Sequence, residues 1–303
     1  MKKFFKSILL FLLPFVCVIA SLEIWLRHIP NTYTYKYEWM QNNAEDVEVL
    51  VLGSSHTFNG IRTSLFNKKA FNLANYSQKT EQDAYFLLRW SGKYKRLKTV
   101  IFPISYATLF YHKLENTNES YRCRYYKIYM DCGLYSFFSK YNIALYDIKI
   151  RIKLNRLKTL FEKKNELWCD KYGWGTAYPI TNKDLNTWEN ADVVKSSQTA
   201  KDWTEINRNI TKIKDIADFC QSHNIRLVLI TTPCWHTYYN QLDKKQLDKM
   251  YELTYELQKE YNLQYLDYLK DNRFIADDFY DSSHLSDIGA NKFTKILKQE
   301  LNL

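Results

Sequence analysis

Residues 47–56 read VEVLVLGSSH, a run of valine and leucine that ends at a glycine and two serines. A short apolar run that stops at a turn residue predicts a buried strand over residues 47–52 and a tight turn at Gly53. A serine on a sharp turn after a buried strand projects its hydroxyl into the site, and its own backbone N–H can face a developing oxyanion. Ser55 is therefore a candidate nucleophile, although serine is also common in ordinary turns.

Strands and helices alternate along most of the rest of the chain. Four more strands are predicted, at residues 70–73, 99–102, 226–231 and 264–268. The spacing of apolar residues predicts helices at residues 80–96, 203–223, 245–261 and 286–301. This alternation predicts an α/β fold, a three-layer sandwich with helices on both faces of a central, mostly parallel sheet. In such sheets the site lies beyond the carboxyl ends of the strands, where Ser55 is expected.

Residues 107–200 interrupt the alternation and are predicted to form one long insertion. They are rich in tyrosine, lysine and arginine, and the segment between Ser139 and Lys164 is predicted to be partly helical. The insertion leaves the sheet directly after Ser105, which follows a strand end. We therefore expect it to pack over the carboxyl ends of the strands and to restrict access to Ser55.

The amino terminus is predicted to be a membrane anchor over residues 1–30. Three lysines precede an uncharged run at residues 7–22, and apolar residues continue past the single Glu23. About 20 apolar residues span a bilayer. Lysines before the run place the amino terminus in the cytoplasm and residues 31–303 outside it. The alternative is a signal peptide cleaved after Ala20, but the continuing apolar residues favour a single-pass anchor in the cell membrane.

Composition and charge exclude several other classes of protein. The net charge is +10, from 43 basic and 33 acidic residues, but no recognised nucleic-acid-binding motif accompanies it, so nucleic acid is not an expected partner. No glycine-rich phosphate loop and no C-x-x-C pair occur, which argues against a nucleotide site and a zinc cluster. The predicted chemistry needs no metal and no cofactor. Cys123 and Cys132 could form a disulfide, or all the cysteines could be free thiols.

A second group of residues that could carry catalytic chemistry lies near the carboxyl terminus, in the string Asp281-Ser282-Ser283-His284. A carboxylate three residues before a histidine can orient its imidazole, and the imidazole can then take a proton from a hydroxyl brought from elsewhere in the fold. The alternative is a surface loop, because Ser286 also resembles the N-cap of the last helix.

The order of the two strings resembles the SGNH/GDSL hydrolase family, over roughly residues 46–106 and 203–303. The resemblance implies a flavodoxin-like SGNH hydrolase fold, with Ser55 as nucleophile, Asp281 as orienting acid and His284 as base. Ser54 stands where the family has an aspartate. That change is common in the membrane-anchored, extracytoplasmic branch of the family.

The resemblance also implies an oxyanion hole. The backbone N–H of Ser55 is one expected donor, and Ser77 lies nearest the glycine whose N–H is the family's second donor. Ser105 stands where the family supplies an asparagine side chain, so that Ser105, His56 or Asn75 could donate instead. The loss of one such donor costs about 2.7–4 kcal/mol in other hydrolases.

Four residues are predicted to bind substrate. Trp235 and His236 follow a strand end and could line an acyl or sugar pocket, and for His236 a structural role is favoured over that of a second base. Trp174, within the string Tyr172-Gly173-Trp174-Gly175, could stack on a sugar or pack the insertion. Asn75 is the fourth candidate. His56 is expected to point away from the nucleophile if the chain is extended there.

The resemblance extends to proteins of alginate O-acetylation and lipoteichoic-acid D-alanylation. It implies an acyl-ester hydrolase or O-acyltransferase that acts on cell-envelope glycan through an acyl-enzyme on Ser55. The expected partners are an acyl donor, a surface polysaccharide or other envelope polymer, the membrane and, as a further candidate, a membrane-bound acyltransferase. The alternative is a catalytically silent glycan-binding or assembly protein, and a third is a generic membrane-tethered α/β domain.

Overall fold

The computed structural model describes residues 1–146 and 167–303, which divide into two compact units. Unit 1 consists of Met1–Tyr37 and Asn118–Leu167, and unit 2 of Glu38–Thr117 and Trp168–Leu303. The partly helical segment predicted between Ser139 and Lys164 falls mostly outside the described residues. The predicted insertion is therefore divided, because only its two ends belong to unit 2.

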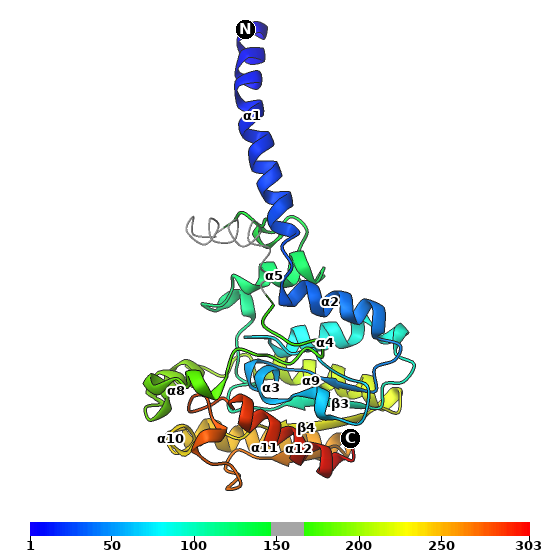
Figure 1. The fold of residues 1–303 in the computed structure, drawn as a ribbon, viewed down its shortest axis with the longest axis vertical. Coiled ribbons are helices and arrows are strands. Elements are labelled where there is room, and N and C mark those ends of the chain that lie inside the picture. The colour runs from blue at the N-terminus through cyan, green and yellow to red at the C-terminus, as the bar shows by residue number, and fades with distance from the viewer. Residues whose placement is uncertain (147–166) are drawn as a thin grey trace. The chain divides into compact units, whose positions relative to one another are not determined.

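Unit 2 is built on a five-stranded sheet in the order β2-β1-β3-β4-β5 (Figure 1). The strands are β1 (Val49–Val51), β2 (Ala70–Asn72), β3 (Thr99–Pro103), β4 (Arg226–Thr231) and β5 (Gln264–Asp267). Every neighbouring pair is parallel. This is the strand order of a flavodoxin-like doubly wound sheet, so the predicted fold class is confirmed.

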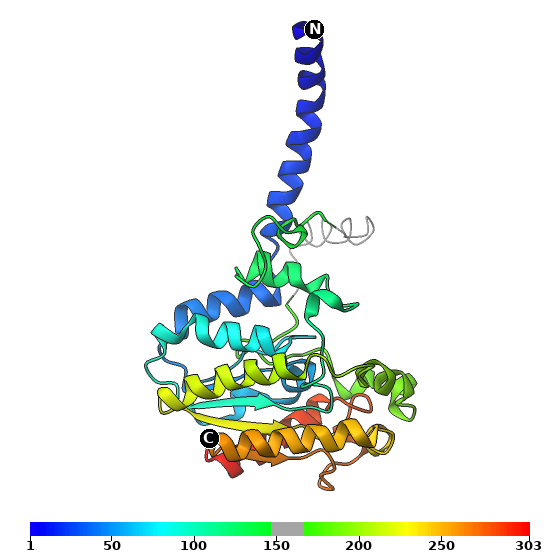
Figure 2. The same cartoon turned by 180° about the vertical axis from the view of Figure 1, so that it is seen from behind.

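Helices cover both faces of the sheet. α9 (Ile206–Ser222) and α11 (Lys244–Tyr261) lie on the face turned to the viewer in Figure 2, and α4 (Thr80–Arg89) packs beside α9. α3 (Ser55–Gly60) and α12 (Asp287–Leu301) contact each other on the face turned to the viewer in Figure 1. The carboxyl ends of the strands lead into the loops that carry the predicted site.

A buried apolar cluster joins the sheet to α12. Val49 and Val51 of β1 belong to it together with Phe293, Leu297 and Leu301 of α12. Residues two apart on a strand share a face, and residues three or four apart on a helix do the same. The alternation of valine and leucine in β1 therefore places one set of side chains against α12. Burial of this kind contributes roughly 25 cal/mol per Å² of apolar surface.

Two of the long helices begin at side-chain caps. Ser286 precedes α12, and its Oγ accepts the N–H of Gly289 at 3.2 Å, which confirms the N-cap expected from the sequence. Asp243 precedes α11, and its carboxylate accepts the N–H of Gln246 at 2.9 Å. Each cap satisfies a backbone donor that has no partner inside the helix.

The helices not yet named are shorter than these two, apart from α1. They are α1 (Lys2–Arg27), α2 (Thr32–Asn43), α5 (Arg122–Tyr129), α7 (Leu185–Trp188), α8 (Asp192–Gln198) and α10 (His236–Tyr239). α4 ends at Arg89, earlier than predicted, and a 3-10 turn at Ser91–Lys93 follows it. Gly92 within that turn explains the difference, because glycine disfavours a continuous α-helix.

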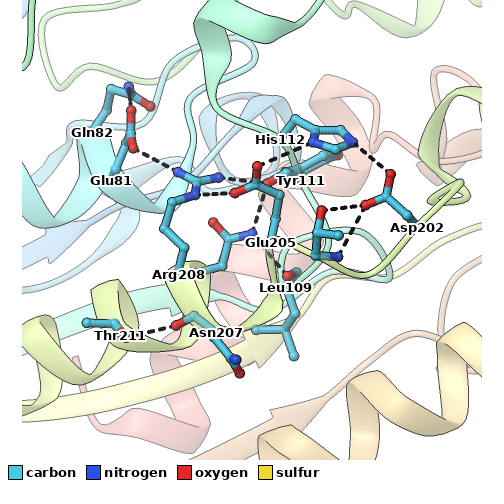
Figure 3. A network of polar contacts seen from close by, with 12 residues as sticks. Glu81, Gln82, Leu109, Tyr111, His112, Asp202, Glu205, Asn207, Arg208 and Thr211 are labelled. Atoms are coloured by element: carbon cyan, nitrogen blue, oxygen red, sulfur yellow. Dashed lines mark hydrogen bonds and ion pairs between the residues drawn. The ribbon is translucent and has the colours of Figure 1, made fainter.

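A polar network fixes the start of the predicted insertion to α9 (Figure 3). The Arg208 guanidinium donates to Glu81 Oε2 at 2.8 Å and to the Tyr111 carbonyl at 2.9 Å, and it also pairs with Glu205. The buried Asn209 amide donates to the carbonyls of Leu109 and Tyr111, at 3.0 and 2.9 Å. The chain that leaves β3 is thereby held against α4 and α9 before it enters unit 1.

Unit 1 contains a helix that is long and apolar enough to cross a membrane. Among the described residues α1 alone meets this test of length and composition. That finding is consistent with the predicted single-pass anchor, while the side of the membrane remains a prediction. All six cysteines fall within the described ranges and are free thiols, so Cys123 and Cys132 are not paired.

Candidate active site

Ser55 and His284 lie in direct contact although 229 positions separate them in the chain. The Ser55 Oγ is 2.8 Å from His284 Nε2. Ser55 is the first residue of α3, directly beyond β1, and His284 lies in the loop that precedes α12. The contact expected from the two sequence strings is therefore present.

Asp281 holds the opposite side of the imidazole. Its Oδ2 and Oδ1 lie 2.8 and 3.0 Å from His284 Nδ1, and Oδ1 also accepts the backbone N–H groups of Ser283 and His284 at 2.8 Å each. Burial alone would raise the pKa of Asp281, but the charge and hydrogen bonds of His284, together with these two N–H groups, lower it to about 2. Asp281 is therefore ionised. A proton on Nδ1 bonds to it, which leaves Nε2 free to accept from Ser55.

The turn before Ser55 is built for close packing. Gly53 has φ +112°, and a Cβ at this position would lie 2.2 Å from Pro103 Cγ. Its N–H donates to the Asp83 carboxylate at 2.8 Å, and the Gln78 side chain donates to the same oxygen at 2.6 Å. Burial raises the pKa of Asp83 to about 7, although both hydrogen bonds act in the opposite direction. Asp83 thus links the turn before Ser55 to the loop after β2.

His56 lies within the site, because the extended chain that would have pointed it away is not present. Because α3 begins at Ser55, the chain is helical and not extended at His56, and the His56 ring stacks on His284 with centroids 4.5 Å apart. Its Nδ1 is 3.5 Å from the Ser54 hydroxyl. The helical turn brings both Ser55 and His56 to His284, which an extended chain would not do.

Ser77 and Ser105, two of the expected oxyanion donors, differ in how well their conformation and hydrogen bonds suit that role. Ser77 has φ +56°, a left-handed conformation that favours glycine and fits its match to a family glycine. Ser105 N donates to Thr108 Oγ1 at 2.9 Å, and the two hydroxyls lie 2.8 Å apart. The Ser105 hydroxyl is therefore shared with Thr108.

Asn75 lies beside the nucleophile turn. Its backbone N–H donates to the Gly53 carbonyl at 3.2 Å. The side chain is buried, and its Nδ2 has no hydrogen-bond partner in the part of the chain that the structure describes. A buried amide without a partner is costly unless something binds it. Asn75 is therefore as well suited to donate to a reacting group as to contact the rest of a substrate.

Three tyrosines that the sequence analysis did not single out stand beside the triad. The rings of Tyr178 and His284 lie edge to face with their centroids 5.2 Å apart, and Tyr280 stacks on Tyr178 at 4.2 Å. Tyr76 is 6.1 Å from Tyr178. Tyr76 and Tyr280 directly precede Ser77 and Asp281, so their positions next to predicted site residues could have identified them from the sequence. Tyr178 lies in the predicted insertion and had no such signal.

The carboxyl-terminal part of the predicted insertion lies against this site. Asn72 N donates to the Tyr172 carbonyl at 2.9 Å, and Gly175 N donates to the Phe58 carbonyl at 2.8 Å. These bonds join it to β2 and α3. Together with Tyr178 beside His284, they support the expectation that this part of the insertion covers the strand ends.

Trp174 is packed into the protein. Its side chain is 7% exposed, its Nε1 donates to the Asn59 carbonyl at 2.7 Å, and the Arg62 guanidinium lies 4.6 Å from the ring centroid. This environment favours packing of the insertion over the alternative prediction, stacking on a sugar. Little of the ring is free to stack on a ligand.

Trp235 and His236 differ in their surroundings. Trp235 is half-buried and stacks on Trp188 with centroids 4.7 Å apart, and its backbone N–H donates to the Ser282 carbonyl at 2.8 Å. It therefore supports the loop that carries Asp281. His236 is exposed at the start of α10. No group of acidic, histidine or cysteine side chains that could hold a metal occurs within the described ranges.

Comparisons with known proteins give distant likenesses. No protein family profile and no curated protein matches the sequence. A proposed acylhydrolase of Bacteroides fragilis matches in structure at 11% identity and TM-score 0.41, covering 87% of this chain and 94% of that one. A GDSL-like lipase of Bacteroides thetaiotaomicron matches at 11% and 0.40, covering 89% and 98%.

A proposed platelet activating factor of Streptococcus pneumonia matches at 12% identity and TM-score 0.42, covering 94% of this chain and 99% of that one. The strand order β2-β1-β3-β4-β5 establishes the fold of this chain independently of these three likenesses.

Proposed function

We propose that unit 2 is a serine-dependent acyl-ester hydrolase or O-acyltransferase of the SGNH/GDSL type. The observation that carries the proposal is the unbroken chain of contacts from Ser55 Oγ through His284 to Asp281. A hydroxyl, an imidazole and an ionised carboxylate in this order are the parts of a nucleophilic catalytic triad.

In the proposed reaction Ser55 Oγ attacks the carbonyl carbon of an acyl ester while His284 Nε2 takes its proton. The tetrahedral intermediate collapses, and His284 returns the proton to the departing alcohol. An acyl-enzyme on Ser55 remains. A water molecule or a sugar hydroxyl then attacks it, with His284 again as base, and Ser55 regains its proton.

The backbone N–H groups of Ser55 and Ser77 are the proposed oxyanion donors, with the Asn75 amide or Ser105 hydroxyl as the third. The left-handed backbone at Ser77 and the unpartnered Asn75 Nδ2 support this assignment. Asn75 Nδ2 is the better candidate of the two side chains, because the Ser105 hydroxyl already lies on Thr108.

We propose cell-envelope glycan as the acyl acceptor or acyl carrier. Two observations support it: α1 is able to cross a membrane, with lysines at its amino-terminal side, and tyrosine rings stand next to the base. Aromatic side chains combine an apolar face with a polar edge, which suits contact with sugars. Tyr280, Trp235 and His236 are the partly exposed candidates for this contact.

The second candidate is a catalytically silent glycan-binding or assembly protein on the same fold. The contact of Ser105 with Thr108 favours it, since Ser105 stands where the family has an asparagine donor and its hydroxyl already bonds to Thr108. The two candidates differ in whether Ser55 is nucleophilic.

A fluorophosphonate probe tests this difference on the full chain in detergent micelles. Ser55 should react covalently, and Ser55→Ala should abolish the labelling. Ser54→Ala is the matched control, because Ser54 is the adjacent hydroxyl and should leave labelling in place. Failure of the wild-type protein to label, with its fold verified by circular dichroism, would favour the silent protein. Labelled protein would next be compared for hydrolysis of an activated acyl ester and for transfer to added oligosaccharide.

A further inference from the structure

A loop of unit 1 is hydrogen-bonded to, and packs against, the carboxyl-terminal end of α1. The Glu23 carboxylate accepts the backbone N–H groups of Ala144 and Leu145 at 2.8 Å each, and Arg27 Nε donates to it at 2.8 Å. Leu26 is fully buried in a small apolar cluster with Ala144. In Figures 1 and 2 the segment between α5 and the grey trace lies around this end of α1.

The length of α1 places this contact at the edge of a bilayer. The chain from Ser7 to Leu26 contains no charged residue except Glu23. Twenty residues at 1.5 Å each are about 30 Å long, the thickness of the hydrocarbon core. Glu23 is therefore in the last turn of the span. A carboxylate at that depth is costly without partners, and its partners here are Arg27 and the two N–H groups of the loop.

The same loop exposes large apolar side chains. Phe138 is 93% exposed and Phe137 is 70% exposed, and the two rings pack edge to face at 5.4 Å. Leu134 and Ile143 are also exposed. Exposed apolar groups that gather on one segment mark an interaction site.

Lys140 stands within this apolar segment. Its Nζ lies 5.3 Å from the ring centroid of Tyr141 and 5.9 Å from that of Tyr146. Phenylalanine and leucine beside lysine and tyrosine are typical of segments that lie in the membrane interface, with aromatic rings at the acyl boundary and cations at the phosphates.

We propose that residues 133–146, the collar, insert Phe137 and Phe138 into the headgroup and acyl boundary of the membrane that α1 crosses. The bilayer is the favoured occupant because the collar is bonded to the last turn of the apolar helix and so shares its depth. The proposal rests on α1 as a membrane span and not on the chemistry of Ser55.

Photo-crosslinking on the full chain in phosphatidylglycerol–phosphatidylcholine vesicles tests the collar. The photoreactive residue p-benzoylphenylalanine replaces Phe138, or Phe11 in the middle of α1, or Tyr255, an exposed aromatic of α11. Lipid adducts should form at positions 138 and 11 and not at 255. Adducts at 11 without adducts at 138 would overturn the proposal, as would adducts at neither position. Equal adducts at all three would also overturn it, since the collar would then have no special depth.

A second variant separates insertion from mere proximity to lipid. With the probe at Leu134, the double change Phe137→Ser and Phe138→Ser should reduce the lipid adduct by about tenfold or more, because the loss of even one phenyl ring from an apolar boundary weakens partitioning by about tenfold. The adduct from a probe at Phe11 should not change. An unchanged adduct at Leu134 would show that the two phenylalanines do not hold the collar in the membrane interface.

Discussion

The imidazole ring of His56 lies almost parallel to that of His284, with the ring centroids 4.5 Å apart and the planes inclined by 14°. Burial, together with the charge that His284 can carry, lowers the pKa of His56 to about 3, although Asp281 acts in the opposite direction. His56 is therefore uncharged at neutral pH and presents a flat surface to His284. When His284 takes the Ser55 proton in the proposed reaction, no second positive charge lies against its ring.

If His56 positions the base by stacking, a flat neutral replacement should preserve activity. His56→Phe should keep most of the acyl-ester turnover. His56→Ala should lower kcat by about tenfold or more, with KM little changed, because a misplaced catalytic group loses rate steeply with distance. Steady-state kinetics on the full chain would measure both. His223→Ala, an exposed histidine at the end of α9, is the control, and equal losses in the two His56 variants would argue against stacking.

The buried His56 should also make the protein sensitive to acid. Its pKa is about 3 in the folded chain against an ordinary 6.5, so the unfolded chain binds the proton first. The free energy of unfolding should therefore decrease as the pH falls from about 6.5 towards 3. His56→Phe removes this contribution, so its Tm relative to wild type should rise progressively over that window. A Tm difference that does not vary with pH would contradict the assignment, and His223→Phe supplies the baseline.

Replacement of Asp281 tests the orientation of the base. Asp281→Asn should lower kcat by up to about 10⁴-fold, the loss that the same change causes in serine proteases, because an amide favours the wrong tautomer of His284. The loss should not exceed that of Ser55→Ala. Asp277→Asn, an exposed carboxylate in the same region, should have little effect. Turnover of an activated ester gives all four values, and an Asp281→Asn variant as active as wild type would remove Asp281 from the mechanism.

The turn at Gly53 predicts a large difference between two glycine substitutions. Gly53→Ala should lower the free energy of unfolding by at least about 1–3 kcal/mol, from its positive φ alone, and more from the clash with Pro103. Gly92→Ala is the matched control, because a Cβ there meets nothing within 4 Å. Urea unfolding of both variants would measure the difference. Similar midpoints for the two would contradict the strain at Gly53.

Membrane topology can be tested independently of chemistry. Because three lysines precede the apolar run, a reporter fused after Leu303 should be active when it requires an extracytoplasmic position and silent when it requires the cytoplasm. The opposite pattern would reverse the orientation. Sequencing of the mature amino terminus would distinguish the anchor from a signal peptide cleaved after Ala20.

Local sequence patterns predict some features of the candidate site and not others. The run that forms β1, the cap at Ser286 and the Asp-x-x-His string were all readable, since each depends on residues close together in the chain. The pairing of Ser55 with His284 was expected only from the resemblance of two distant strings to a known arrangement. The direction of the His56 ring could not be settled from the sequence, because an extended chain and a helical turn point that side chain in different directions.

The sequence by itself determined the alternation of strands and helices, the apolar first helix and the residue types available for nucleophilic chemistry. Periodicity and capping act over a few residues, so the printed order is enough to read them. Only the tertiary structure decided that Trp174 is packed under Arg62, that Tyr178 borders the base and that Asp83 bonds the Gly53 turn. These contacts join segments from different strand ends, and which side chains meet there depends on strand order and on the volume that packing leaves open.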